Sequence, residues 1–196
     1  MAPYFETVKS FADVPVESGV DTRQFLEASD GLVMMFDLFG SQVFGFVQAD
    51  IRNNIQGVRK RYLCTEHSST TLESLVETEA AEGHKEGTPC LVRLIRGLAL
   101  TCQALQHMQR DQSAELHVCF KRSYDSVLKH HHSFIIRSVV YVAIRAVPRR
   151  KEFYDKIAQG GSKEKLDTEM NRWLEALEVI VGRMSAFLEK GGFGKV

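Results

Sequence analysis

Two polar residues one helical turn apart are the first candidates for chemistry in this sequence. Asp50 and Asn54 lie in a segment with helical periodicity, so their side chains share one helix face, which Gly57 and Arg61 extend. A carboxylate accepts hydrogen bonds from N–H and O–H groups, and a carboxamide both donates and accepts them. This pair suits recognition of a polar ligand group. The same spacing is also common on ordinary solvated helix faces, so both interpretations stay open.

Three consecutive histidines, His130, His131 and His132, are the second candidate. On one helix, successive side chains point about 100° apart, so the three rings cannot hold one metal ion together. The cysteines are scattered without the spacing of a zinc site. They are Cys64, Cys90, Cys102 and Cys119. We therefore expect no metal and no cofactor, with two of the histidines facing solvent and one turned inward.

Several classes of function are disfavoured. The sequence has no GxxxxGK[ST] or GxGxxG loop, no GxSxG, no HExxH and no evident pair of catalytic carboxylates. An enzyme is thus disfavoured by elimination. The 25 basic residues balance 25 acidic ones, whereas a nucleic-acid-binding protein usually has a basic excess. We expect no nucleic-acid partner.

The composition is typical of a folded, water-soluble chain. Of the 196 residues, 44% are hydrophobic and 26% charged, which suits one domain with a sizeable core. The most apolar stretch, 134–147, contains Arg137 and Arg145 and is shorter than the roughly 20 residues that span a bilayer. Its first residues lack the apolar run of a signal peptide, so we expect a cytoplasmic protein with reduced cysteines.

Helical periodicity runs through most of the chain, and no segment alternates with period two for long enough to form a convincing strand. Helices are predicted over about 21–40, 44–62, 70–83, 89–105, 116–127, 131–147, 151–158 and 166–187. We expect an all-α fold, a two-layer sandwich of about eight helices. It would form a single domain over 1–196, with a short N-terminal segment 1–20 and a Gly-rich tail 191–196.

Three local signals indicate where helices begin. Asp21 with Gln24 and Thr70 with Glu73 have the spacing of a capping box, in which a short polar side chain satisfies free main-chain N–H groups. Pro89 suits the first turn of a helix, where its missing N–H costs nothing.

Three segments, taken in order, resemble the glycolipid transfer protein family. They are 36–41 (FDLFGS) with 50–55 (DIRNNI), 93–98 (RLIRGL) with 101–105 (TCQAL), and 128–134 (LKHHHSF) continuing to Pro148 and Phe153. The resemblance covers most of the chain. It is nearest to the fungal heterokaryon-incompatibility type lipid transfer proteins. Segment 11–16 (FADVPV) and the predicted helix that contains Trp173 and Leu174 also resemble that branch. It implies an all-helical sandwich that carries one sphingolipid between membranes without changing it chemically.

The resemblance also implies roles for single residues. Asp50 would accept hydrogen bonds from the lipid amide and head group, Asn54 would lie at the head group, and His132 would hold the ceramide carbonyl. Phe134 corresponds to an aromatic residue at a membrane-facing mouth. The lipid chains would lie among apolar side chains that are equally typical of a packed core. These are Phe36, Phe44, Val47, Ile55, Leu91, Val140 and Ile144.

Two positions depart from the family pattern. Glycolipid-selective members have a sugar-stacking Trp where this chain has Arg93, and a Lys where it has Gly57. Either Arg61 or Arg59 could replace that Lys. Arg61 and Gly57 are therefore accessory candidates for the head-group site. A guanidinium offers forked donors that match a phosphate, so Arg93 would favour an anionic head group.

The anionic pattern is only half present. The ceramide-1-phosphate branch has Arg at the position of Arg93 and a second Arg four residues earlier, where this chain has Pro89. An Arg93 that points to solvent and pairs with an acid of the third predicted helix is an equal alternative.

Basic residues near Phe134 suggest a membrane contact. Arg137, Arg145 and Arg149, followed by Arg150, lie on or just after the predicted helix 131–147. Each basic residue near an anionic bilayer adds about 1 kcal/mol of attraction. The alternative is an ordinary helix end, where arginines complement the helix dipole.

The leading interpretation is a sphingolipid transfer protein without catalytic activity. Its expected partners are one sphingolipid, a glycosylceramide or ceramide-1-phosphate, and a membrane surface that it touches transiently. No dimer seam is evident, so we expect a monomer. The alternative is a lipid sensor or an interaction module in signalling that keeps the fold and transfers little lipid.

Overall fold

The computed structural model describes residues 2–39 and 44–196, and its regular elements there are all helices. They are α1 (Tyr4–Thr7), η1 (Phe11–Asp13), α2 (Thr22–Asp37), α3 (Phe44–Cys64), η2 (Glu66–Ser68), α4 (Leu72–Ala81), α5 (Gly87–Arg110), α6 (Leu116–Ser123), η3 (Tyr124–Leu128), η4 (Lys129–His131), α7 (Phe134–Arg145), α8 (Arg150–Ala158) and α9 (Lys163–Lys190). The all-α prediction is confirmed. Among the described helices, none has both the length and the apolar character to cross a bilayer.

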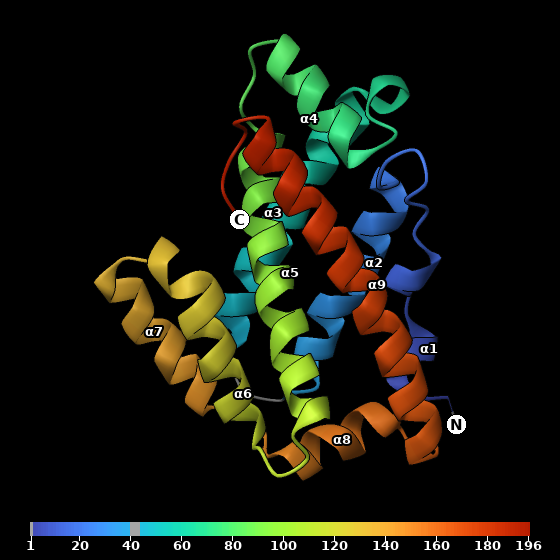
Figure 1. Cartoon of the computed structure of the whole chain (residues 1–196), viewed down its shortest axis with the longest axis vertical. Coiled ribbons are helices and arrows are strands. Elements are labelled where there is room, and N and C mark those ends of the chain that lie inside the picture. Colours follow the sequence, from blue (N-terminus) through green and yellow to red (C-terminus); the bar gives the residue numbers. More distant parts are fainter. Residues whose placement is uncertain (1, 40–43) are drawn as a thin grey trace.

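The long helices pack in two layers, as predicted. In Figure 1, α5 and α9 lie in front of α3 and α2, α6 and α7 stand to one side of α5, and α4 and α8 lie at opposite ends. Phe11 of the N-terminal segment joins the layers in the core. Its ring centroid lies 6.1 Å from that of Phe25 on α2 and 5.0 Å from that of Trp173 on α9.

Helices α3 and α5 pack against each other in antiparallel directions, with a glycine at each close contact. A Cβ atom added to Gly57 of α3 would overlap Sγ of Cys90. A Cβ atom added to Gly87 of α5 would lie 2.7 Å from Cβ of Arg61. Since residue numbers rise along α3 as they fall along α5, these contacts fix one register for the pair.

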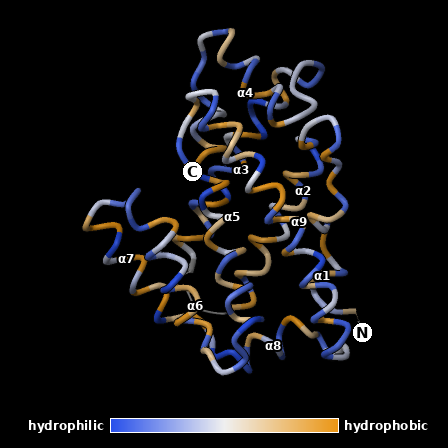
Figure 2. The backbone as a smooth tube through the Cα atoms, in the orientation of Figure 1, coloured by the Kyte–Doolittle hydropathy of each residue, from blue (hydrophilic) through white to orange (hydrophobic). Residues whose placement is uncertain are grey.

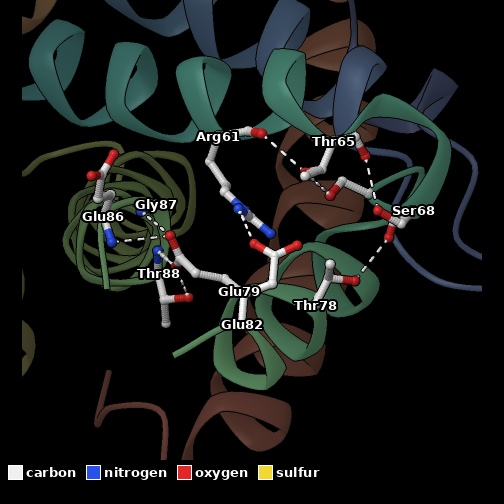
Figure 3. A network of polar contacts seen from close by, with 10 residues as sticks. Arg61, Thr65, Ser68, Thr78, Glu79, Glu82, Glu86, Gly87 and Thr88 are labelled. Carbon is white, nitrogen blue, oxygen red and sulfur yellow. Dashed lines mark hydrogen bonds and ion pairs between the residues drawn. The ribbon is translucent and has the colours of Figure 1, made fainter. Parts of the chain in front are cut away.

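A buried carboxylate of α4 holds the beginning of α5. Oε1 of Glu79 accepts the main-chain N–H groups of Glu86 and Gly87 at 3.0 and 2.7 Å, and Oε2 accepts that of Thr88 at 2.6 Å (Figure 3). These are N–H groups that a helix start otherwise leaves without partners. Helix α5 therefore begins at Gly87, two residues before Pro89, where the sequence predicted its start.

The two predicted helix caps have different outcomes. At α2 the Asp21 cap is confirmed, because its Oδ1 accepts the N–H of Gln24 at 2.8 Å, but the box is not closed, since the Asp21 N–H donates to Pro15. At α4 the cap lies one residue later than predicted. Thr71 and Ser74 each accept the other's main-chain N–H at 3.1 Å. The main-chain carbonyl of Thr70 instead accepts an N–H from the start of α2.

The helix predicted over 131–147 begins at Phe134 and ends at Arg145. Before it, α6 continues into a π-helical turn, η3, and a 3-10 turn, η4. His132 has extended backbone, and Oγ of Ser133 caps α7 by accepting the N–H of Ile136 at 3.4 Å. The three histidines therefore lie in and after a turn, not on the helix that follows.

The Glu79 carboxylate gives a test of this architecture. Burial raises the pKa of Glu79, but the hydrogen bonds of Thr88, Gly87 and Glu86 outweigh burial and hold the pKa below its ordinary value. Glu79→Gln places an amide against N–H donors, so we expect it to lower the free energy of unfolding by about 2 kcal/mol near neutral pH. Urea denaturation measures the change.

The sign with pH follows from the lowered pKa. The carboxylate stabilises the folded chain above the ordinary Glu pKa of about 4.3, and its contribution is lost as the pH falls toward the lower folded value. The difference between wild type and Glu79→Gln should therefore shrink at about pH 3.5. Glu77→Gln, an exposed change on the same helix, is the control and should have little effect. A pH-independent loss at Glu79, or equal losses in both variants, would contradict this account.

Candidate functional site

One cavity brings seven of the predicted head-group and lipid-chain residues together. It encloses about 330 Å³ between α2, α3, α5, α6 and α7, at the low end of the volumes typical of ligand pockets. Its wall is mainly apolar, and polar side chains lie along part of its lining. Those polar residues are Asp50, Arg93, Arg96, Thr101, His131 and His132. Other hollows on the described surface, such as one between α5, α8 and α9, are lined mostly by charged and amide side chains.

A chain of hydrogen bonds links α5 to α3 at this cavity. The Nε–H of Arg93 donates to Oδ1 of Asn54 at 2.9 Å. Nδ2 of Asn54 donates to the main-chain oxygen of Asp50 at 2.9 Å and to its Oδ2 at 3.3 Å. Asn54 is only 4% exposed, so these bonds fix its orientation, whereas Asp50 is exposed and lines the cavity. Arg93 is exposed, as its alternative role expects, but within the described residues it forms no ion pair with an acid of α4.

Gly57, which stands at the position of the family Lys, and the two arginines predicted to replace that Lys all lie outside the cavity lining. Gly57 faces Cys90, which leaves no room for a side chain at that position. Nη1 of Arg61 forms an ion pair with Glu82 at 2.6 Å, and the hydrogen bond to Glu82 raises the pKa of Arg61 (Figure 3). Arg59 forms an ion pair with Asp30 of α2 at 2.7 Å. Neither arginine lines the cavity; each joins α3 to another helix.

The apolar residues predicted for the lipid chains divide into three groups. Phe36, Val47, Val140 and Ile144 line the cavity. Ile55 and Leu91 are fully buried and absent from its lining, so they belong to the packed core. The side chain of Phe44 lies outside the described part of the structure. Several lining residues were not named from the sequence, because an apolar stripe looks the same in a core and in a cavity wall. They are Phe46, Ile51, Leu100, Phe120, Leu128 and Ile136.

His132 is held at the cavity by both its ring and its main chain. Nδ1 of its ring lies 3.1 Å from the hydroxyl of Tyr124. Its main-chain N–H donates to Lys129 at 3.2 Å, and its carbonyl accepts the Nε–H of Arg137 at 2.9 Å. Arg137, predicted as a membrane contact, thus donates to the turn that carries His132. Burial lowers the pKa of the His132 imidazole, which favours the neutral ring.

The cavity also has a second arginine that sequence reasoning did not single out. Nε of Arg96 donates to the main-chain oxygen of Lys195 at 2.9 Å, so the C-terminal segment holds this side chain. Burial and then the charge of Arg93 lower the pKa of Arg96. Burial, followed by the charge of Arg96, also lowers the pKa of His131. Cationic groups therefore gather near the single carboxylate of Asp50.

Helix α7 exposes an unusually apolar surface. Phe134 is 82% exposed and Ile135 75%, and Val139 and Val142 are also exposed. Figure 2 shows hydrophobic segments along α7, which stands out at one side of the molecule. Phe46 at the start of α3, itself part of the cavity lining, is exposed too. Of the other predicted membrane contacts, Arg145 and Arg149 are exposed.

The chain also matches known proteins in sequence. Residues 20–159 match the family model described as glycolipid transfer protein (GLTP). The chain is 41% identical over 187 residues to a glycolipid transfer protein of Aureobasidium melanogenum, covering 94% of this chain and 92% of that one. Relatives with a pleckstrin homology domain match 76% of this chain but 30% of their own length.

Solved structures match as well. HET-C2, a fungal glycolipid transfer protein, superimposes with a TM-score of 0.90 at 37% identity, covering 95% of this chain and 96% of that one. Human ceramide-1-phosphate transfer protein in complex with 12:0 ceramide-1-phosphate superimposes with a TM-score of 0.86 over 98% of both chains. At 18% identity, the latter match concerns the fold alone.

The close contact at Gly57 gives a second prediction. Gly57→Ala adds a Cβ atom against Sγ of Cys90 and should lower the free energy of unfolding by about 1–3 kcal/mol, as overpacking does. In a Cys90→Ala chain the sulfur is absent, so the same change should cost less. Chemical denaturation of the four chains gives the coupling between the two sites. Equal costs in both backgrounds would show that this contact does not limit the approach of α3 to α5.

Proposed function

The chain belongs to the glycolipid transfer protein family, and from this membership and the cavity we propose that it binds one sphingolipid and carries it between membranes. The observation that carries the proposal is a mainly apolar cavity with a hydrogen-bonding set at one side. Asp50 and His132, which the family pattern singles out, line this cavity from α3 and from the turn before α7, and Asn54 is hydrogen-bonded to Asp50. No catalytic step is part of the proposal.

Each polar group has a distinct part in lipid binding. The Asp50 carboxylate accepts the amide N–H and a hydroxyl of the sphingolipid, and Asn54 orients that carboxylate. The imidazole of His132 donates to the acyl carbonyl. Hydrogen bonds to charged groups contribute roughly 1.5–3 kcal/mol each. These contacts choose which lipid is carried, because each chain leaves one hydrocarbon environment for another and its burial energy largely cancels over the transfer cycle.

The two arginines on α5 favour an anionic head group. Arg93 and Arg96 lie three residues apart on one helix and both line the cavity. Within the described part of the chain neither forms an ion pair, so both can neutralise a phosphate. A guanidinium binds phosphate through paired donors, whereas the sugar-stacking Trp of glycolipid-selective members offers a flat aromatic face. We therefore propose a preference for ceramide-1-phosphate or a similar anionic sphingolipid over neutral glycosylceramides.

The exposed face of α7 is the proposed membrane contact. Phe134 and Ile135 would insert into the bilayer surface, and Arg145 and Arg149 would face anionic lipid head groups. Helix α7 also forms one wall of the cavity through Val140 and its neighbours. A contact there would place the entrance for the lipid chains at the membrane. The family also leaves a second candidate, a lipid sensor with little transfer activity.

Removing the Asp50 carboxylate tests the proposal directly. Asp50→Asn keeps the size of the side chain and loses a charged acceptor, so we expect transfer of a fluorescent sphingolipid between vesicles to fall by about tenfold or more. Asp155→Asn, an exposed change on α8, is the control and should transfer normally. Native mass spectrometry of the purified wild type should show one bound sphingolipid. A lipid-free mass together with no transfer would favour an interaction module, and a bound lipid without transfer would favour a sensor.

Arg93→Trp tests the head-group preference separately. The substitution restores the aromatic face and removes a phosphate donor, so the ratio of ceramide-1-phosphate transfer to glucosylceramide transfer should fall by about tenfold. The same vesicle assay, with lactosylceramide as a third substrate, measures it. If the transfer rates of all three lipids stay unchanged, Arg93 does not determine the head group.

A further inference from the structure

We propose that Tyr124 is a positioning residue that fixes one tautomer of His132, the form that presents its Nε2–H for hydrogen bonding at the cavity. The inference rests on the proposed function, since it assumes that His132 donates to the lipid. It adds a residue that the family pattern in the sequence did not single out. Its basis is the geometry of the turn between α6 and α7.

The ring of His132 lies against a buried tyrosine. Tyr124 begins the π-helical turn η3, its side chain is fully buried, and its hydroxyl lies 3.1 Å from Nδ1 of His132. The two ring centroids are 5.8 Å apart, with the planes tilted by 42°. His132 lines the cavity, and the bond to Tyr124 occupies one of its two ring nitrogens. Nε2 is left as the nitrogen that can bind a ligand.

The direction of this hydrogen bond determines the tautomer. Burial raises the pKa of the Tyr124 hydroxyl, so it stays protonated. Among the described residues, Nδ1 of His132 is the one hydrogen-bond partner of this hydroxyl. A buried hydroxyl hydrogen without an acceptor is unfavourable, so the Tyr124 O–H donates and Nδ1 accepts. A neutral imidazole whose Nδ1 accepts carries its hydrogen on Nε2.

Neighbouring contacts hold both partners in place. The ring of Tyr141 on α7 packs edge-on against that of Tyr124, with centroids 5.4 Å apart at 83°, and its own hydroxyl donates to Oδ1 of Asp125 at 2.6 Å. The main chain of His132 is tied to Lys129 and Arg137. A π-helical turn of this kind is rare and often occurs at functional sites. The imidazole is therefore oriented before any ligand arrives.

The test compares two tyrosine variants by NMR and by transfer. Nitrogen-15 shifts of labelled histidine distinguish the two tautomers of a neutral ring. In the wild type without lipid, His132 should show the Nε2–H form. Tyr124→Phe keeps the ring and removes the hydroxyl, so both tautomers should appear and sphingolipid transfer should fall by about tenfold. Tyr141→Phe is the matched control: it removes a hydroxyl from the same cluster, bonded to Asp125, and should leave the His132 tautomer unchanged.

A double variant separates tautomer control from simple packing. His132→Gln has a side-chain amide with no tautomer to set, so adding Tyr124→Phe should reduce transfer by less than about twofold. A wild-type His132 in the Nδ1–H form, or shifts that Tyr124→Phe leaves unchanged, would overturn the proposal. A full further loss in the double variant would also overturn it, since Tyr124 would then act through packing. If the tautomer changes while transfer by Tyr124→Phe and by His132→Ala stays normal, the positioning role stands and the proposed donor role of His132 is wrong.

Discussion

The close contact between α3 and α5 sets the geometry of the whole site. Gly57 and Gly87, one on each helix, let the two backbones approach more closely than side chains would allow. The register of this contact then brings Asn54 beside Arg93. Further along α5, Gly97 lines the cavity, and a Cβ atom there would meet nothing within 4 Å. The helices thus pack tightly at one end of their contact and leave a space at the other.

Residues far away in the sequence support the contact between α3 and α5, and for this reason the sequence predicted some helix boundaries and not others. Apolar spacing predicted the long helices correctly, because burial of one face imposes its period on the sequence. Taking Pro89 as the first residue placed the start of α5 two residues late, since the carboxylate that satisfies the first N–H groups of that helix comes from Glu79 on α4. Apolar spacing misplaced the start of α7, since a π-helical and a 3-10 turn precede that helix and have no apolar period of their own. Helix interiors follow local pattern, whereas their ends depend on tertiary partners.

The residues of the candidate site were also predicted only in part from the sequence, because several of them depend on tertiary contacts. A family pattern named Asp50 and His132, and the structure places both at the cavity. Ile55 was named with the chain pocket although it lies in the core, because hydrophobicity does not reveal whether a neighbour is a side chain or a ligand. The membrane contact named for Arg137 stays a prediction, and hydrophobicity gave no sign that its Nε–H donates to main-chain carbonyls of the turn before α7. Tyr124 gave no signal, since its role depends on a contact across that turn.

Three arginines at or near the cavity donate to neutral acceptors, which orient them and leave their charges in place. Arg93 donates to the amide oxygen of Asn54, Arg96 to the main-chain carbonyl of Lys195, and Arg137 to that of His132. Each acceptor is neutral, so each guanidinium is oriented without being neutralised, and within the described residues none of the three forms an ion pair. An acidic partner would orient an arginine equally well but would cancel much of the field of its charge. The chain has equal numbers of acidic and basic residues, yet the lining of its cavity has two arginines and one carboxylate. Orientation by neutral acceptors therefore lets a chain of zero net charge keep charged guanidinium groups at its cavity.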